Sequence, residues 1–161
     1  MIAVVGCGNA SRSDDGVGPH VVRALAMRTA CKDDRVRLLD AGTDGMGVMF
    51  VARGCQSLII IDACRSGSPA GAVFEVPGGQ IERAHEPSFT LHDFRWNHAL
   101  FAGRRIFREA FPKDVTVLLI EAETVDFGLE LSREVAEAAE KVIERVEALV
   151  RSRLQTPECM Q

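Results

Sequence analysis

Apolar and polar positions follow two different periods along the chain. Five short apolar runs predict strands, the last being the weakest because its apolar residues alternate only in part: residues 2–5, 36–39, 58–61, 115–120 and 72–76. Elsewhere apolar residues recur every three or four positions, which is typical of helices with one buried face. These helical segments lie at residues 19–29, 45–53, 93–110 and 133–152.

The segment at 133–152 has the clearest helical pattern. Ser132 precedes it as the expected N-cap, and Glu134 places a negative charge in the first turn, where the helix dipole favours it. The run at 58–61 contains no polar residue, so we expect a central parallel strand covered on both faces. Because strands and helices alternate, the sequence predicts an α/β sandwich around a mostly parallel, twisted sheet of about five strands.

The length of 161 residues is that of one domain, and the chain contains no repeat or linker. We expect a single domain at residues 1–153 and a flexible C-terminal tail at 154–161. The least regular stretch, residues 65–89, is rich in glycine and proline. It could form a mobile flap beside a cleft or a surface excursion around an edge strand.

Composition narrows the possible classes of protein. The net charge of −4 and the dispersed lysines and arginines argue against a nucleic-acid-binding surface. No apolar stretch reaches the length of a membrane span, and the N-terminal run lacks the basic start and cleavage region of a signal peptide. The five cysteines include no Cys-x-x-Cys pair, and their odd number without a disulfide-scaffold pattern favours reduced thiols and a cytoplasmic protein.

A glycine-rich segment, GCGNASRSDDGVG at residues 6–18, follows the first predicted strand. Gly6 and Gly8 match the first two glycines of a dinucleotide-binding fingerprint, but Ser11 stands at the third. Asp40 ends the second strand, yet it lies well beyond the usual separation of about 20 residues for a ribose-binding acid. The adjacent carboxylates of residues 14 and 15 would also repel a pyrophosphate.

Three groups of titratable side chains are predicted at the carboxyl edge of the sheet, where open α/β folds bind ligands. Asp14 and Asp15 follow the first strand, Asp62 follows the third, and His92 lies at the start of the helix predicted at 93–110. Two carboxylates and a neutral imidazole make a plausible site for a divalent metal ion. The alternatives are that Asp14 or Asp15 caps the following helix and that Asp62 begins an Asx turn.

Trp96 and the remaining histidines are interpreted as residues without a role in the site, with Trp96 and His98 assigned to helix packing. The remaining histidines are His20, His85 and His98. The cysteines are interpreted as core thiols, with Cys7 the exception to follow because it lies in the glycine-rich segment.

Five motifs occur in collinear order along the chain: Gly6-x-Gly8-Asn9-x-x-x-x-Asp14-Asp15-Gly16-x-Gly18, Asp40-Ala-Gly42-Thr43-x-Gly45-Met46, Ile60-Ile61-Asp62-Ala63, Thr90-Leu-His92 and Asp126-Phe-Gly128-Leu-x-Leu-Ser132. Together they resemble the motifs of the hydrogenase maturation proteases, which trim the C-terminus of [NiFe]-hydrogenase large subunits. The resemblance extends over nearly the whole chain, and it implies a three-layer α/β/α sandwich.

The resemblance also implies a function and a site. Asp15, Asp62 and His92 would bind a nickel ion carried by the substrate, a large-subunit precursor, and would form the catalytic site of a nickel-dependent, aspartic-type endopeptidase. No permanent cofactor is expected, and the protein is expected to be a monomer in isolation. The segment Gly42-Thr43-Asp44-Gly45 is a looser candidate for contact with the substrate tail. The alternative is a nucleotide- or nickel-binding, metallochaperone-like module without peptidase activity.

Overall fold

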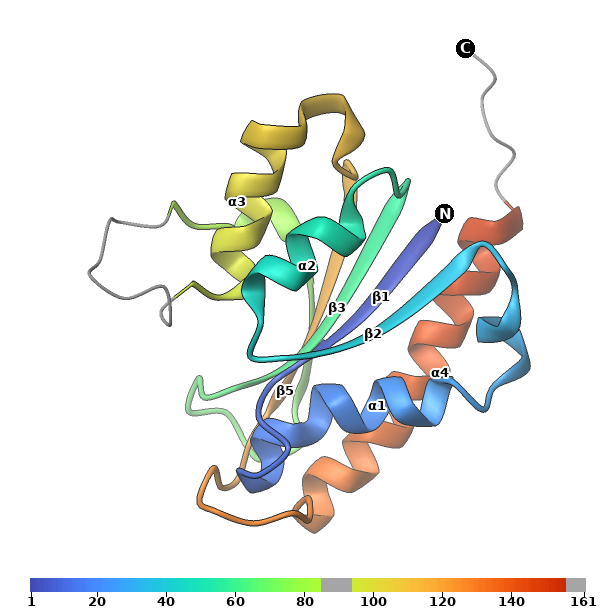
Figure 1. Ribbon diagram of the computed structural model, residues 1–161. Helices are drawn as coiled ribbons and strands as arrows, with labels where there is room; N and C mark the ends of the chain where they lie inside the picture. Colours follow the sequence, from blue (N-terminus) through green and yellow to red (C-terminus); the bar gives the residue numbers. More distant parts are fainter. Residues whose placement is uncertain (85–93, 156–161) are drawn as a thin grey trace.

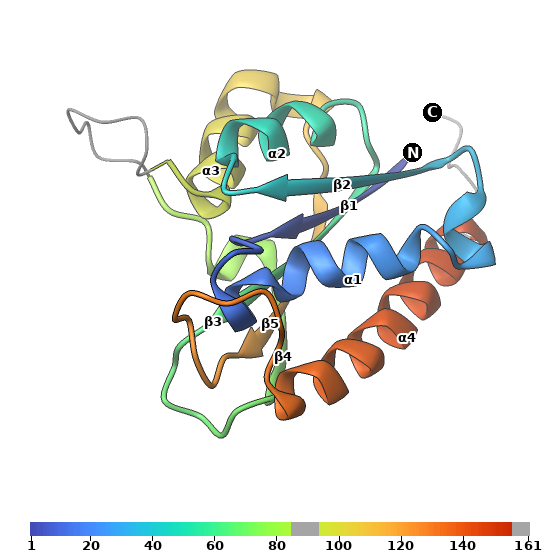
Figure 2. The ribbon, with the colours of Figure 1, turned by 60° about the horizontal axis from the view of Figure 1, so that its bottom comes forward.

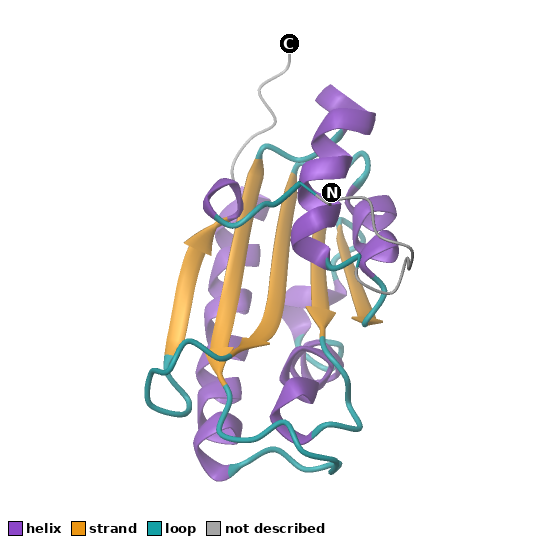
Figure 3. Cartoon of the chain, turned by 90° about the vertical axis from the view of Figure 1, so that its left-hand side faces the viewer, coloured by secondary structure: helices purple, strands orange, loops and turns teal. Residues whose placement is uncertain are grey.

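The computed structural model of the protein describes residues 1–84 and 94–155. Its centre is a five-stranded sheet in the order β2-β1-β3-β5-β4. The strands are β1 (Ile2–Cys7), β2 (Val36–Gly42), β3 (Ser57–Cys64), β4 (Val73–Pro77) and β5 (Asp114–Glu121). Only β4, at one edge, is antiparallel to its neighbour, as Figure 3 shows. The predicted strands and the mostly parallel sheet are therefore confirmed.

Helices cover both faces of the sheet, which makes the fold a three-layer α/β/α sandwich (Figures 1 and 2). The α-helices are α1 (Val17–Leu25), α2 (Gly45–Ala52), α3 (Trp96–Phe107) and α4 (Arg133–Gln155). Short 3-10 helices include η1 (Ser13–Gly16), η2 (Thr29–Lys32), η3 (Gly78–Gln80) and η5 (Arg108–Ala110). Helices α1 and α4 pack on one face, and α2 and α3 pack on the other.

Strand β3 shows how the apolar pattern builds two cores. Its side chains alternate between the faces, so Ile59 and Ile61 join the core under α1 and α4. Leu58 and Ile60 join the core under α2 and α3. All four are fully buried, which confirms that the unbroken apolar run is a central strand.

The predicted boundaries of α1 and α3 need correction. Helix α1 ends at Leu25 rather than at residue 29, because the next large apolar residue, Met27, is 78% exposed and has no core to pack against. Helix α3 begins at Trp96 rather than at 93, and it ends before Arg108, whose φ of 48° breaks the helical geometry.

Helix α4 is longer than predicted. It continues to Gln155, and Leu154 packs against the core, so residues 154 and 155 belong to the helix rather than to a flexible tail. At its other end the Ser132 carbonyl accepts a hydrogen bond from the Ala136 N–H, as an N-cap residue would. Within residues 1–84 and 94–155, no helix combines the length and apolarity needed to cross a membrane.

Candidate functional site

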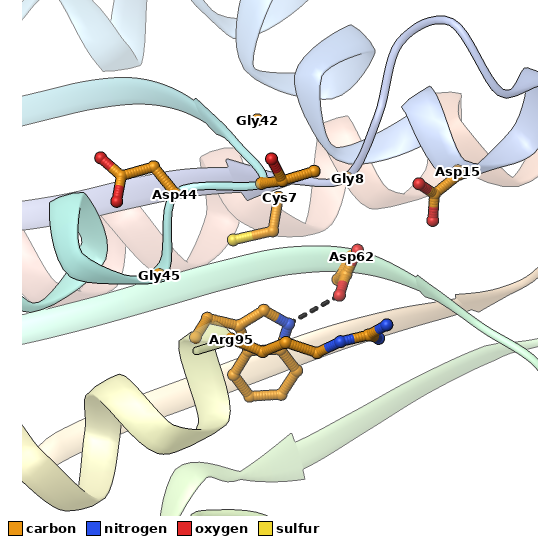
Figure 4. Close-up of a pocket in the computed structure, with 10 residues that line it drawn as sticks. Cys7, Gly8, Asp15, Gly42, Asp44, Gly45, Asp62 and Arg95 are labelled. Atoms are coloured by element: carbon orange, nitrogen blue, oxygen red, sulfur yellow. Dashed lines mark hydrogen bonds between the residues drawn. The ribbon is translucent and has the colours of Figure 1, made fainter. Parts of the chain in front are cut away.

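A cavity of about 180 Å³ opens at the carboxyl edge of the sheet (Figure 4). Since β1, β2 and β3 are mutually parallel, the segments that follow them meet at this edge. The cavity is lined by Cys7, Gly8, Asp15, Gly42, Thr43, Asp44, Gly45, Asp62, Arg95 and Trp96. Two of the three residues that the sequence selected for chemistry therefore line one cavity, together with the segment 42–45.

Asp14 and Asp15 are neighbours in the sequence but face opposite environments. The Asp14 side chain is fully buried and accepts four hydrogen bonds, from the backbone N–H groups of Glu123, Thr124 and Ser132 and from the Ser132 hydroxyl. It therefore joins the segment after β1 to the segment between β5 and α4. Neither aspartate caps α1, whose N-cap is Gly16 without a side-chain bond, so the capping interpretation is wrong.

Asp15 faces the cavity. Its Oδ2 atom accepts a hydrogen bond of 2.8 Å from the Asn9 N–H, which fixes the orientation of the carboxylate. Gly8 allows the close approach of this segment to β3: its φ is 122°, and a Cβ there would overlap the Asp15 carbonyl oxygen and lie 3.4 Å from Asp62 Oδ1. The glycine-rich segment is thus folded tightly enough to place Asp15 beside the end of β3.

Asp62 lies at the carboxyl end of β3, on the wall of the cavity. Its Oδ1 atom accepts the Ala63 N–H at 2.9 Å, and its Oδ2 atom accepts the Trp96 indole N–H at 2.6 Å, the dashed line in Figure 4. Burial, with a smaller contribution from the charge of Asp15, raises the pKa of Asp62 to about 6. The two hydrogen bonds act in the opposite direction and limit the rise of this pKa.

The interpretation of Trp96 as a packing residue is therefore wrong in part. Its ring packs against the core beneath α2 and α3, but its N–H reaches Asp62 and its surface lines the cavity. Arg95, also missed by the sequence analysis, lines the cavity and is the N-cap residue of α3. No local motif connects either residue to Asp62, which is more than 30 positions away.

His98 lies in the first turn of α3. Its Nδ1 atom accepts a hydrogen bond from the Arg95 N–H at 3.2 Å, so its ring takes part in the N-terminal cap of this helix. His92 falls outside the described residues, as does His85. Among residues 1–84 and 94–155, no group of three or more His, Cys, Asp or Glu side chains is arranged to hold a metal ion.

Cys7 lines the cavity, but its side chain is nearly inaccessible. Burial raises the pKa of its thiol well above the usual value, and the negative charges of Asp62 and Asp40 act in the same direction. A nucleophilic cysteine needs a lowered pKa and access to the substrate. Cys7 is therefore a core thiol rather than a candidate nucleophile.

A family model described as hydrogenase maturation protease matches residues 19–149. The chain belongs to this family. The Hydrogenase 2 maturation protease of Escherichia coli is 29% identical over 151 residues, which cover 93% of this chain and 90% of that protein. The delta subunit of coenzyme F420 hydrogenase from Methanothermobacter thermautotrophicus is 36% identical over 93 residues, which cover 52% of this chain and only 59% of the subunit.

A solved structure leads to the same family. The hydrogenase maturating endopeptidase HybD from Escherichia coli superposes with a TM-score of 0.80 at 28% identity, covering 94% of this chain and 93% of that one. The three-layer fold expected from the motifs is thus the fold of a hydrogenase maturation protease.

In this family member, the glycine-rich segment at residues 6–18 is unsuited to binding phosphate. Phosphate-binding loops present free backbone N–H groups at a helix N-terminus. Here the N–H groups donate instead to the protein's own oxygen atoms, at Asn9, Ser11, Arg12, Ser13, Asp14 and Asp15. Asp40, the candidate ribose-binding acid, forms an ion pair of 2.8 Å with Arg23. Both observations argue against the dinucleotide interpretation.

Proposed function

We propose that the protein is an endopeptidase that removes the C-terminal extension of a nickel-loaded [NiFe]-hydrogenase large-subunit precursor. The observation that carries this proposal is the pairing of Asp15 and Asp62 in one cavity of a maturation-protease fold. We assign the reaction to the cytoplasm and to the monomeric protein. Nickel arrives with the precursor, so it is part of the substrate and not a resident cofactor.

Asp15 and Asp62 are suited to recognising a divalent ion. Each carboxylate is fixed by a hydrogen bond from the protein, from the Asn9 N–H and the Trp96 indole respectively. Such outer partners hold a ligand oxygen in the orientation that a metal ion requires. His92 is the third proposed ligand, on the basis of its Thr90-Leu-His92 motif, and an imidazole together with carboxylates suits nickel.

Asp62 also has the properties of a general base. Because its pKa is about 6, the carboxylate is mostly ionised at neutral pH and can still accept a proton from water. Proton transfer to Asp62 would allow water to attack the scissile carbonyl carbon, and the proton would then pass to the leaving amine. Recognition of nickel at the same carboxylates makes cleavage conditional on metal insertion.

The substrate tail is proposed to lie along residues 42–45. These residues line the cavity beside the two carboxylates, and a second cavity of about 300 Å³ shares Gly8, Gly42 and Thr43 with the first. The two cavities thus continue one another across the ends of β1 and β2. An extended peptide could cross both, with its scissile bond near Asp62.

The test is to incubate the purified protein with a precursor in nickel-free and nickel-loaded forms and to follow the precursor's C-terminal mass. We expect a mass loss only in the nickel-loaded form. Asp62→Asn and His92→Ala should abolish it. Asp34→Asn and His20→Ala change the same residue types at exposed positions and should leave processing intact.

Two outcomes would contradict this proposal. Cleavage that is equally fast without nickel would remove the metal from recognition. Tight Ni²⁺ binding by the free protein, measured by calorimetry together with an absence of cleavage, would favour the nickel-binding module instead.

A further inference from the structure

One motif remains without a role in the proposed reaction, the segment Asp126-Phe-Gly128-Leu between β5 and α4. It presents two large apolar side chains to solvent: Phe127 is 87% exposed and Leu129 is 84% exposed. Single exposed apolar residues are common on protein surfaces, whereas apolar residues gathered at one place mark interaction sites. These two residues stand on either side of Gly128, within one short segment of the surface.

The segment is held in a fixed position. Gly128 forms a parallel bridge with Arg12, its carbonyl accepts the Ser13 N–H at 2.8 Å, and its N–H donates to the Ser11 carbonyl at 3.1 Å. The Arg12 guanidinium lies 5.3 Å from the centroid of the Phe127 ring, within the range of a cation–π contact. Because the segment is held by these contacts, the exposure of Phe127 and Leu129 is a property of the folded structure.

The residues that hold this segment in place belong to the same loop as Asp15. Figure 2 shows the loop before α4, in orange, beside the blue loop after β1. Arg12 and Asp15 are three residues apart, so their Cα atoms are at most about 11 Å from each other. The Asp15 N–H also donates to the Arg12 carbonyl at 3.0 Å, which makes this turn a tight one.

The proximity of the apolar surface to Asp15 favours one occupant. A stable protein–protein interface covers about 800 Å² on each partner, a patch roughly 30 Å across. A polypeptide whose own segment occupies the Asp15–Asp62 cavity would therefore extend over Phe127 and Leu129. We propose that Phe127, Leu129 and the stacked Arg12 form a docking surface for the body of the precursor polypeptide. This inference rests on the proposed function, because it takes the precursor as the polypeptide in the cavity.

The test uses the nickel-free precursor, whose binding the docking surface should support because this surface lies outside the nickel site. Its Kd is measured for the wild-type protein and for the double variant Phe127→Ser, Leu129→Ser. We expect Kd to rise about tenfold or more, since buried apolar contacts at an interface commonly carry that much affinity. The matched control is Met27→Ser, which removes a side chain that is 78% exposed beyond the far end of α1 and should leave Kd unchanged.

With the nickel-loaded precursor, the double variant should show a raised KM and an unchanged kcat. The fold of each variant is checked by its thermal unfolding, which these exposed positions should not alter. Equal Kd values for the wild type and the double variant would overturn the docking surface. No binding of the nickel-free precursor by the wild type would overturn it too, because this surface lies outside the nickel site.

Two further outcomes separate the possible failures. Unchanged binding together with nickel-dependent cleavage would remove the docking surface and retain the proposed function. Weakened binding by the double variant without any cleavage by the wild type would retain the surface and remove the peptidase activity. A wild-type dimer that the double variant dissociates, observed by light scattering, would assign the surface to a second copy of the chain and overturn the proposal.

Discussion

At the residue scale, the adjacent carboxylates Asp14 and Asp15 provide a direct comparison. Asp14 is buried with four hydrogen bonds, whereas Asp15 accepts one from Asn9 and lines the cavity. Asp14→Asn would place amide hydrogens against backbone donors. We expect a loss of about 2–4 kcal/mol in the free energy of unfolding, measured with urea.

Asp15→Asn should have the opposite profile. Its side chain is not a structural anchor, so we expect a change in unfolding free energy of less than about 1 kcal/mol together with a loss of precursor processing. Equal destabilisation by the two variants would contradict this division between a structural and a reactive aspartate.

Trp96 is the chain's only tryptophan, and the chain has no tyrosine. Trp96→Phe keeps most of the ring but removes the N–H that donates to Asp62. Hydrogen bonds to charged groups are stronger than those between neutral groups. We therefore expect the loss of this one to lower kcat for processing roughly tenfold. Because this bond lowers the Asp62 pKa, its loss should move the acid limb of the pH–rate profile above about pH 6.

The measurement is a pH profile of kcat/KM for the wild type and Trp96→Phe. A lower rate with an unshifted profile would mean that Trp96 acts only by packing. In the wild type, intrinsic fluorescence reports on this position alone, so binding at the cavity can be followed without a label.

The sequence could predict part of the site at this scale. Asp15 and Asp62 follow apolar strands, and parallel strands end at one edge, so their proximity follows from the pattern. The roles of Asp14, Trp96 and Arg95 could not be predicted. Asp14 depends on contacts with residues more than 100 positions away, and Trp96 depends on how the start of α3 packs against the end of β3.

At the scale of elements, Gly45 controls how α2 approaches the start of α3. A Cβ at this position would overlap the Phe94 carbonyl oxygen and lie 2.7 Å from the Arg95 carbonyl carbon. Gly45→Ala should therefore displace the start of α3 and the Trp96 ring. We expect about 1–3 kcal/mol of destabilisation, measured with urea, and a loss of processing.

Gly79→Ala is the control for this prediction. A Cβ at Gly79 would meet no atom within 4 Å, so the variant should behave as the wild type. Wild-type stability and processing in Gly45→Ala would show that the start of α3 adjusts without affecting the cavity.

The existence of each strand and each α-helix could be predicted from its period, whereas the 3-10 helices and the helix ends could not. Unbroken or alternating apolar runs identified the strands, and residues 58–61 identified the centre of the sheet. The ends of α1 and α3 depend on the exposure of Met27 and the positive φ of Arg108, which are properties of the folded chain. The end of α4 depends on the packing of Leu154 against the core.

At the scale of the whole molecule, two carboxyl groups give opposite dependences of stability on pH. Hydrogen bonds from Ser66 and Gly67 lower the pKa of Glu121 to about 2, with Ser66 making the larger contribution. Glu121 therefore stabilises the fold at pH values above its unfolded pKa of about 4.3, and this stabilisation is lost as pH falls toward 2. Above about pH 5 its contribution is constant.

Asp62 acts in the opposite sense because its pKa is raised in the folded state to about 6. Below the pKa of about 3.9 that Asp62 has in the unfolded state, the group is protonated in both the folded and the unfolded protein. It then does not lower the free energy of unfolding. As pH rises to 6, the unfolded state releases its proton first, so the free energy of unfolding decreases. Since Asp62 opens onto the cavity, we expect a decrease of about 1–2 kcal/mol between pH 4.5 and 7.

This prediction is tested by urea unfolding of the metal-free protein between pH 4.5 and 7. Asp62→Asn cannot ionise, so its curve should be flatter than that of the wild type. Asp34→Asn, at an exposed position, should follow the wild-type curve. A flatter curve for an inactive Asp62→Asn would mean that the fold gives up stability at Asp62, as pH rises, to keep an ionisable carboxyl in the cavity. Parallel curves for the wild type and Asp62→Asn would contradict the raised pKa, and with it the assignment of Asp62 as a base poised near neutral pH.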